Sequence, residues 1–180
     1  MKLMLKNVRI AFPALFQAKT VNGEGAPAFS AAFIFEPGHP AEKMLRDAYE
    51  AVGKEKWGAK WPTVKKAMEG AGKLLVQDGD VKADYDGYPG NLFVNARSKT
   101  RPLVIDEQRN PLTESDGRPY AGCYVNASIE LWPQDNQYGK RINASLRGVQ
   151  FFADGEAFAG GGAASEDEFD EVDTDADNLV

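Results

Sequence analysis

The chain has 180 residues, of which 43% are hydrophobic and 27% charged, and its formal net charge at pH 7 is −6. This balance is ordinary for a soluble protein, and the length suits one domain with an appendage. No apolar run reaches the roughly 18 residues that a membrane-spanning helix needs, and the first residues become polar too soon for a secretory signal. We therefore expect a cytoplasmic protein without a membrane partner.

The acidic residues are concentrated at the C-terminal end. Residues 165–180 hold eight of the 27 acidic residues and no lysine or arginine. Setting these aside leaves 19 acidic residues against 21 basic ones, so the remainder carries a net charge of about +2. The sequence thus predicts a slightly basic domain joined to an acidic tail.

Two strands and a helical segment are predicted in the first half. Residues 3–12 are expected to form a strand that ends at Phe12-Pro13, and residues 28–35 are apolar enough for a second, buried strand. Residues 41–53 carry apolar side chains at helical spacing, with Gly53 as the expected C-cap. A second short, lysine-rich helix is predicted over residues 62–69.

The second half favours strands. Apolar and polar residues alternate with a period of two over 92–97, 123–132 and 141–147, and turn signals such as Asp116-Gly117 separate these runs. Such alternation predicts an antiparallel sheet with one buried face. Together with the two earlier strands, the pattern suits a mainly β protein: an OB-fold-like antiparallel barrel of about five strands with a short inserted helical segment.

A glycine-rich run over residues 155–164 separates the predicted barrel from the acidic end. We predict one nucleic-acid-binding domain over residues 1–158. Residues 159–180 are expected to form a flexible linker and a disordered acidic tail, because they offer almost no apolar surface to bury.

Catalytic chemistry is poorly represented. His39 is the only histidine and Cys123 the only cysteine, which excludes most histidine-based catalytic sites and zinc sites. Cys123 lies on the apolar side of an alternating run, so we expect it in the core. The nucleotide-binding glycine motifs are absent from the sequence. We expect a protein that is not an enzyme and has no cofactor.

One enzymatic alternative stays open, a metal-dependent nuclease. Its carboxylates would come from the run between residues 78 and 86, where Asp78, Asp80, Asp84 and Asp86 are clustered. Adjacent glycines make loop and turn roles the favoured interpretation of these aspartates.

Single-stranded nucleic acid offers phosphates and exposed base faces, so a protein that binds it needs cations and aromatic rings. The predicted strand around residues 93–101 supplies both on one side: Phe93, Asn95, Arg97, Lys99 and Arg101. The alternative is that Phe93 packs beneath the helical segment.

A predicted hairpin loop over residues 132–141 supplies a second set: Trp132, Tyr138, Lys140 and Arg141. Long hairpin loops of OB-folds flank the nucleic-acid groove, which favours a binding role for these residues. The alternative is a rigid loop that Trp132 anchors.

The acidic tail is predicted to regulate binding. It can occupy a cationic groove when DNA is absent, and so compete with DNA through Coulomb attraction. It can also serve as a ligand for protein partners. The residues assigned to this role are Glu166, Asp167, Glu168, Phe169, Asp170, Glu171, Asp173, Asp175 and Asp177.

Several short blocks occur in a recognisable order. They are Asn7-Val8-Arg9, Phe12-Pro13, Leu15-Phe16, Asp78-Gly79-Asp80, the run 120–126 (Tyr-Ala-Gly-Cys-Tyr-Val-Asn), Gly148-Val149-Gln150 and Asp154-Gly155-Glu156. In these blocks the sequence resembles a family of tailed-phage single-stranded-DNA-binding proteins with an OB-fold.

The resemblance implies a protein that coats and protects single-stranded DNA during phage replication or recombination. It does not indicate which positions touch DNA, so the candidate residues above depend on the strand-face argument alone. The expected partners are single-stranded DNA, duplex DNA once the tail is removed, and replication proteins that bind the tail; a homodimer is left open. The competing functions are an acidic-tailed protein-interaction or virion-associated module and the nuclease.

Overall fold

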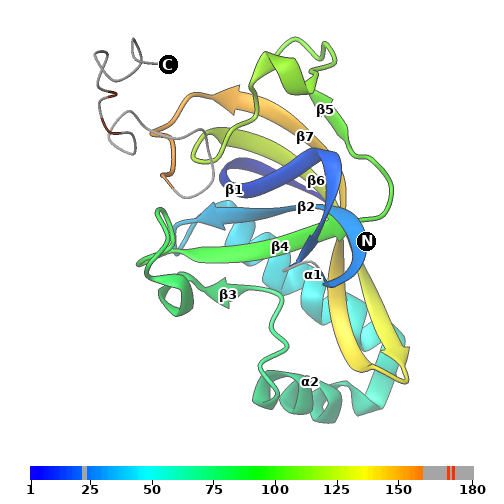
Figure 1. Cartoon of the computed structure of the whole chain (residues 1–180). Coiled ribbons are helices and arrows are strands. Elements are labelled where there is room, and N and C mark those ends of the chain that lie inside the picture. The colour runs from blue at the N-terminus through cyan, green and yellow to red at the C-terminus, as the bar shows by residue number, and fades with distance from the viewer. Residues whose placement is uncertain (22–23, 160–169, 171, 173–180) are drawn as a thin grey trace.

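The computed structural model of the protein describes residues 1–21, 24–159, 170 and 172. In this part of the chain, five long strands close a barrel, and two helices are inserted between the second and third of them (Figure 1). The barrel strands are β1 (Lys2–Val21), β2 (Glu24–Phe35), β4 (Leu92–Ser98), β6 (Tyr124–Asn136) and β7 (Gly139–Ala153). The helices are α1 (Pro40–Trp57) and α2 (Trp61–Gly70), and two short strands, β3 (Gln77–Asp78) and β5 (Leu103–Ile105), pair at the edges.

The barrel confirms the predicted OB-like fold and corrects its strand directions at one place. β1 pairs antiparallel with β2 and with β6, β2 with β4, and β6 with β7. The ring is closed by a parallel pairing of β4 with β7, at Arg97 and Ser145. This parallel pair is unavoidable, because a closed ring with an odd number of strands cannot alternate direction at every neighbour.

Strand β1 extends well beyond its predicted end at Phe12-Pro13. The pairing of β1 with β2 shifts register between Ala11 and Ala14, and Phe12 adopts a positive φ of 49° there. Proline lacks a backbone donor, and an irregular position in a ladder is where that loss is tolerated. The strand therefore bends at Pro13 and continues to Val21.

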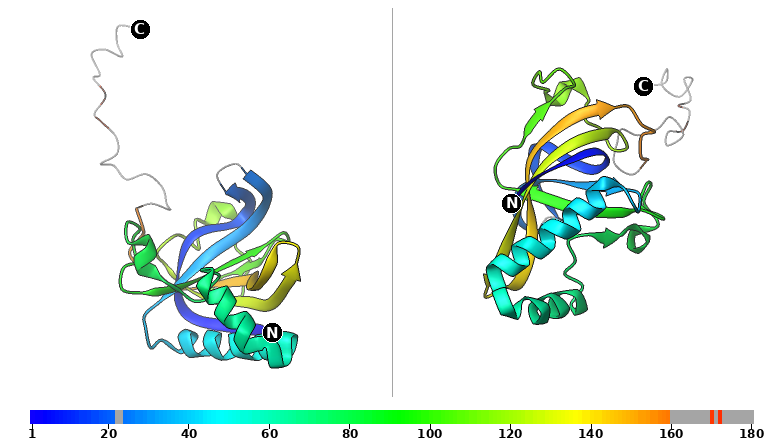
Figure 2. Two further views of the ribbon diagram at one scale, coloured as in Figure 1. Left: turned by 90° about the horizontal axis from the view of Figure 1, so that it is seen from below. Right: turned by 180° about the vertical axis from the view of Figure 1, so that it is seen from behind.

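Both helices were predicted, and both are longer than expected. Helix α1 begins at Pro40, where the His39 ring accepts a hydrogen bond from the backbone of Ala41 at 2.9 Å. Gly53 is not its C-cap but lies inside the helix, where its missing side chain lets the ring of Trp61 approach. Neither helix in the described part of the chain is long and apolar enough to cross a membrane. Figure 2 shows α1 lying across one end of the barrel, with α2 and the β6–β7 hairpin beyond it.

Two apolar clusters hold the domain together. The larger one fills the barrel and continues under α1, with Leu5, Phe33 and Ile129 fully buried. The smaller one lies on the outer face of β1, β2 and β4 and comprises Ala11, Ala32, Ile34, Tyr88, Phe93, Ala121 and Phe158. Because Phe158 is buried in this cluster, packed chain reaches as far as that residue. The predicted linker and tail beyond residue 159 lie outside the described residues, apart from Asp170 and Val172.

Replacing Phe93 by alanine tests the second cluster. Phe93→Ala is expected to lower the free energy of unfolding by about 3–5 kcal/mol, because it leaves a cavity in a packed region. Urea denaturation measures the change. Tyr138→Ala is the matched control: its ring is 77% exposed, and the expected change is within about 0.5 kcal/mol. Equal losses in the two variants would contradict a packed role for Phe93.

Candidate nucleic-acid interface

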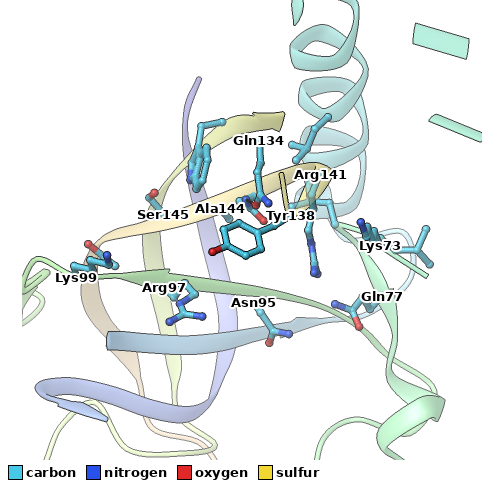
Figure 3. Close-up of a pocket in the computed structure, with 16 residues that line it drawn as sticks. Lys73, Gln77, Asn95, Arg97, Lys99, Gln134, Tyr138, Arg141, Ala144 and Ser145 are labelled. Carbon is cyan, nitrogen blue, oxygen red and sulfur yellow. Dashed lines mark hydrogen bonds between the residues drawn. The ribbon is translucent and has the colours of Figure 1, made fainter. Parts of the chain in front are cut away.

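A groove of about 690 Å³ separates β4 from the β6–β7 hairpin (Figure 3). We call it the β4–hairpin groove. Three parts of the chain line it: β4, the hairpin, and the segment that leads from α2 into β3. The lining residues with polar or aromatic side chains are Lys73, Gln77, Asn95, Arg97, Ser98, Lys99, Trp132, Gln134, Tyr138, Arg141, Asn143 and Ser145. The groove therefore brings together the two candidate segments that the sequence offered separately.

The closure of the barrel places these segments side by side. Arg97 on β4 is bridged to Ser145 on β7, and both residues line the groove. Between Ser145 and Gly139, β7 lies beyond its bridge to β4 and is paired with β6. This part of the β6–β7 hairpin projects from the barrel (Figure 1). The hairpin thus forms one wall of the groove and the outer side of β4 the other.

The lining is strongly cationic. Lys73, Arg97, Lys99 and Arg141 contribute four positive charges, and the lining includes no carboxylate. None of these four cations forms an ion pair with another described residue. Arg147, by contrast, is paired with Glu130 at 3.2 Å and lies outside the groove. Unneutralised cations in a concave surface raise the local concentration of anions.

Two aromatic rings are exposed at the groove. Trp132 on β6 is 43% exposed, and Tyr138 in the hairpin turn is 77% exposed. The turn is fixed locally, because the Asn136 side chain accepts a hydrogen bond from the backbone of Tyr138 at 2.9 Å. In Figure 3 the Tyr138 ring lies over the groove, opposite Asn95 and Arg97 on β4. Exposed rings beside cations provide the stacking surfaces that unpaired bases use.

The helices hold the hairpin in place. The indole nitrogen of Trp57, at the end of α1, donates to a carboxylate oxygen of Asp135 at 3.2 Å. The Trp57 ring stacks on Trp61 with centroids 5.8 Å apart. Lys73 lies against the hairpin turn, since a Cβ on Gly139 would be 2.7 Å from its ammonium nitrogen. The sequence analysis missed Lys73, Gln77 and Trp57, because only the tertiary fold brings them to the hairpin.

Phe93 corrects the sequence analysis. It shares a strand face with Asn95 and Arg97, but its exposed fraction is 0%. The Tyr88 ring contacts it edge to face at 5.0 Å between centroids, and the Lys82 ammonium lies 5.2 Å from its centroid. The outer sheet face is therefore covered at this end by the segment around residues 79–90, which includes the short 3-10 helix η2 (Gly79–Lys82), and not by α1 or α2. Phe93 cannot stack on a base in this conformation.

Two further candidates lie outside the β4–hairpin groove. Arg101 follows β4, where its guanidinium is 6.0 Å from the centroid of Phe29. Lys140 lines a separate cleft beside α2. Of the predicted tail residues, only Asp170 is described, and it is exposed; the others lie outside the described residues. The regulatory role of the tail stays a prediction.

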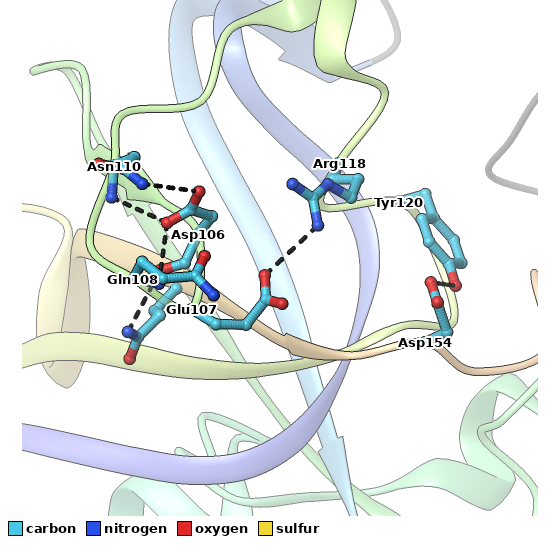
Figure 4. A network of polar contacts seen from close by, with 8 residues as sticks. Asp106, Glu107, Gln108, Asn110, Arg118, Tyr120 and Asp154 are labelled. Carbon is cyan, nitrogen blue, oxygen red and sulfur yellow. Dashed lines mark hydrogen bonds and ion pairs between the residues drawn. The ribbon is translucent and has the colours of Figure 1, made fainter.

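Three of the sequence blocks that carry the family resemblance, those around Arg9, Tyr120 and Asp154, meet at another place, where β6 begins and β7 ends. Arg9 donates to the carbonyl oxygens of Gly122 at 3.0 Å and Glu156 at 2.8 Å. Tyr120 donates to a carboxylate oxygen of Asp154 at 2.7 Å (Figure 4). Gly122 has a φ of +102°, and a Cβ there would lie 2.2 Å from the Glu156 oxygen, so only glycine fits. These blocks fasten the end of the barrel and do not line the groove.

The comparisons with known proteins decide the family. The family model of the Enterobacter phage Enc34 ssDNA-binding protein matches residues 1–179. The chain belongs to this family. The putative protein p50 of Acyrthosiphon pisum secondary endosymbiont phage 1 is 47% identical over 176 residues, which are 96% of this chain and 94% of that protein.

Solved structures agree with the Enc34 family assignment. The Enc34 protein in complex with ssDNA matches with a TM-score of 0.72 and 28% identity, over 87% of this chain and 88% of that one. The single-stranded-DNA-binding protein gp2.5 of bacteriophage T7 matches with a TM-score of 0.57 and 13% identity, over 95% of this chain and 98% of that one. At that identity, the T7 match shows a shared fold alone.

Membership of the Enc34 family, a family of binding proteins, confirms that the chain is not an enzyme. Three of the four aspartates of the nuclease alternative accept hydrogen bonds from loop backbone instead. Asp78 accepts from the backbone of Asp80, Asp80 from Gly90, and Asp86 from Ala159, all at 2.9–3.0 Å. Within the described ranges, no three His, Cys, Asp or Glu side chains are placed to hold a metal ion.

Cys123 is fully buried, as the sequence analysis expected, and burial raises the pKa of its thiol to about 11. At about pH 8 only about one thousandth of the thiol would be ionised, and the thiolate is the reactive form. The folded protein is therefore expected to react negligibly with a thiol reagent such as Ellman's reagent. The protein unfolded in urea should release one equivalent. Rapid reaction of the folded protein would contradict the buried placement.

Proposed function

We propose that this protein binds single-stranded DNA in the β4–hairpin groove without sequence preference, and coats it during phage replication or recombination in the host cytoplasm. The observation that carries the proposal is the composition of the groove. Four cations that form no ion pair with a described residue, and two exposed aromatic rings, face one concavity whose lining contains no carboxylate. Lysine and arginine bind phosphates, and every base has a face that can stack on an aromatic ring. Such a surface therefore favours single strands and does not discriminate between sequences.

The solved complex of the Enc34 protein with ssDNA supports the same conclusion, since that protein shares the fold over most of both chains. The groove is basic although the chain has a net charge of −6, so the acidic tail can be attracted to it. We propose that residues 165–180 compete with DNA for the groove, or recruit replication proteins when DNA occupies it. Both roles follow from eight acidic residues without a compensating cation.

The two exposed rings test the binding site. Tyr138→Ala and Trp132→Ala are each expected to weaken binding to oligo-dT by about 1–3 kcal/mol, because each removes a stacking surface. Fluorescence titration at fixed salt measures the loss. Tyr85→Ala is the matched control, since Tyr85 is 48% exposed but lies outside the groove. If Tyr138→Ala, Trp132→Ala and Tyr85→Ala bind equally well, the groove is not the site. Wild-type protein that fails to bind at low salt would favour the protein-interaction module.

Removal of residues 165–180 tests the tail. The truncated protein is expected to bind oligo-dT more tightly than the intact one, with the largest difference at low salt, because the competing charges are gone. It is also expected to bind duplex DNA, since attraction to phosphates does not require unpaired bases. Titrations of both proteins at two salt concentrations measure these changes. Weaker binding by the truncated protein would contradict competition by the tail.

A further inference from the structure

A second cleft lies between helix α2 and the hairpin. Its volume is about 310 Å³, and we call it the α2 cleft. One side is α2 and the turn after it, where Ala67 is exposed and Val64 and Met68 are buried; the other side is Lys140 at the start of β7. The lining residues are Thr63, Val64, Ala67, Met68, Ala71, Lys73 and Lys140.

The α2 cleft adjoins the β4–hairpin groove at Lys73. Lys73 lines both depressions, and its ammonium group lies against the hairpin turn at Gly139. Successive residues of a strand point to opposite sides, which explains why Arg141 lines the groove while Lys140 lines the cleft. The tip of the hairpin therefore has a cationic depression on each of its two sides.

The charge of the α2 cleft suits a polyanion. Lys73 and Lys140 are its charged residues, and neither forms an ion pair with a described residue. Lys65, also on α2, differs in this respect: the Glu50 carboxylate accepts a hydrogen bond from it and holds it against α1. The rest of the cleft lining is small or apolar, which allows the apolar face of a sugar or a base to pack there while its hydrogen-bonding edge stays in water.

We infer that the bound strand continues from the β4–hairpin groove around the hairpin tip into the α2 cleft, where Lys73 and Lys140 contact its phosphates. This inference rests on the proposed function. It adds to the binding path a second segment, which lies beyond the hairpin tip. Tyr138 then stacks with a base on one side of the tip, and Lys140 holds the backbone on the other. The contribution of the α2 cleft therefore depends on DNA length, whereas that of the groove does not.

A charge placed in the α2 cleft tests this path. Ala67 is exposed on α2 inside the cleft, and Ala51 is exposed on α1 outside it, so Ala67→Glu and Ala51→Glu are matched variants. Both replace an exposed helical alanine by another good helix former. Their affinities for oligo-dT of about 4 to about 16 nucleotides, the range of OB-fold site sizes, are compared with those of the wild type. Circular dichroism and urea midpoints confirm that both variants fold.

We expect the affinities of the three proteins to differ only for the longer oligonucleotides. The three proteins should bind the shortest oligonucleotides equally. Wild type and Ala51→Glu should gain affinity as the strand lengthens, and Ala67→Glu should gain at least several-fold less. In parallel, Lys140→Ala should reduce the slope of log affinity against log salt by about 0.7 for long strands and leave it unchanged for short ones.

The outcomes separate the inference from the proposed function. If wild type binds oligo-dT and Ala67→Glu gains affinity with length as fully as Ala51→Glu, the path through the α2 cleft is wrong and the groove stands. An unchanged salt slope for Lys140→Ala with long strands would also overturn it. If the wild type binds no oligonucleotide of any length, the proposed function itself fails.

Discussion

The parallel pairing of β4 with β7 is the constraint on which the rest of this molecule depends. Five strands cannot close a ring by antiparallel pairs alone, so one contact must join strands that run the same way. That contact, at Arg97 and Ser145, brings the third barrel strand beside the fifth. It sets the β6–β7 hairpin against the cationic side of β4 and creates the groove between them. The candidate binding surface is thus a direct result of how the barrel closes.

Much of this fold could be predicted from the periodicity of the sequence. Alternation over the runs that became β4, β6 and β7 identified the strands and their buried sides, and the helical spacing after residue 41 identified α1. Strand continuity through Pro13 could not be predicted, because it depends on a register shift that only the partner strand defines. The length of α1 was underestimated because Gly53 is there for the approach of Trp61, a tertiary contact.

Most of the candidate site residues could be predicted from the sequence, but the boundaries of the site could not. Asn95, Arg97 and Lys99 were chosen from one strand face, and Trp132, Tyr138 and Arg141 from a predicted hairpin loop. All six line one groove. Phe93 was chosen by the same argument and is buried, because alternation tells which face a residue is on and not whether another segment covers that face. Lys73 has no periodic signal at all, since its place beside the hairpin is set by the turn after α2. The family blocks around Arg9, Tyr120 and Asp154 predicted the family correctly, and in the structure they fasten one end of the barrel rather than line the groove.

The burial of Phe158 has a consequence for the acidic tail. Its ring is held in the outer cluster, and the backbone of Phe158 donates to Ala121 at 3.0 Å, so the chain leaves the domain from a fixed point. Under the proposed competition, a tail that starts there would be a tethered ligand, and the effective concentration of such ligands reaches about millimolar for short flexible connections. The proposed competition would be intramolecular, and it would not weaken when the protein is diluted. The concentration of DNA needed to displace the tail from the groove would then be a property of each single molecule. It would be the same at every concentration of the protein.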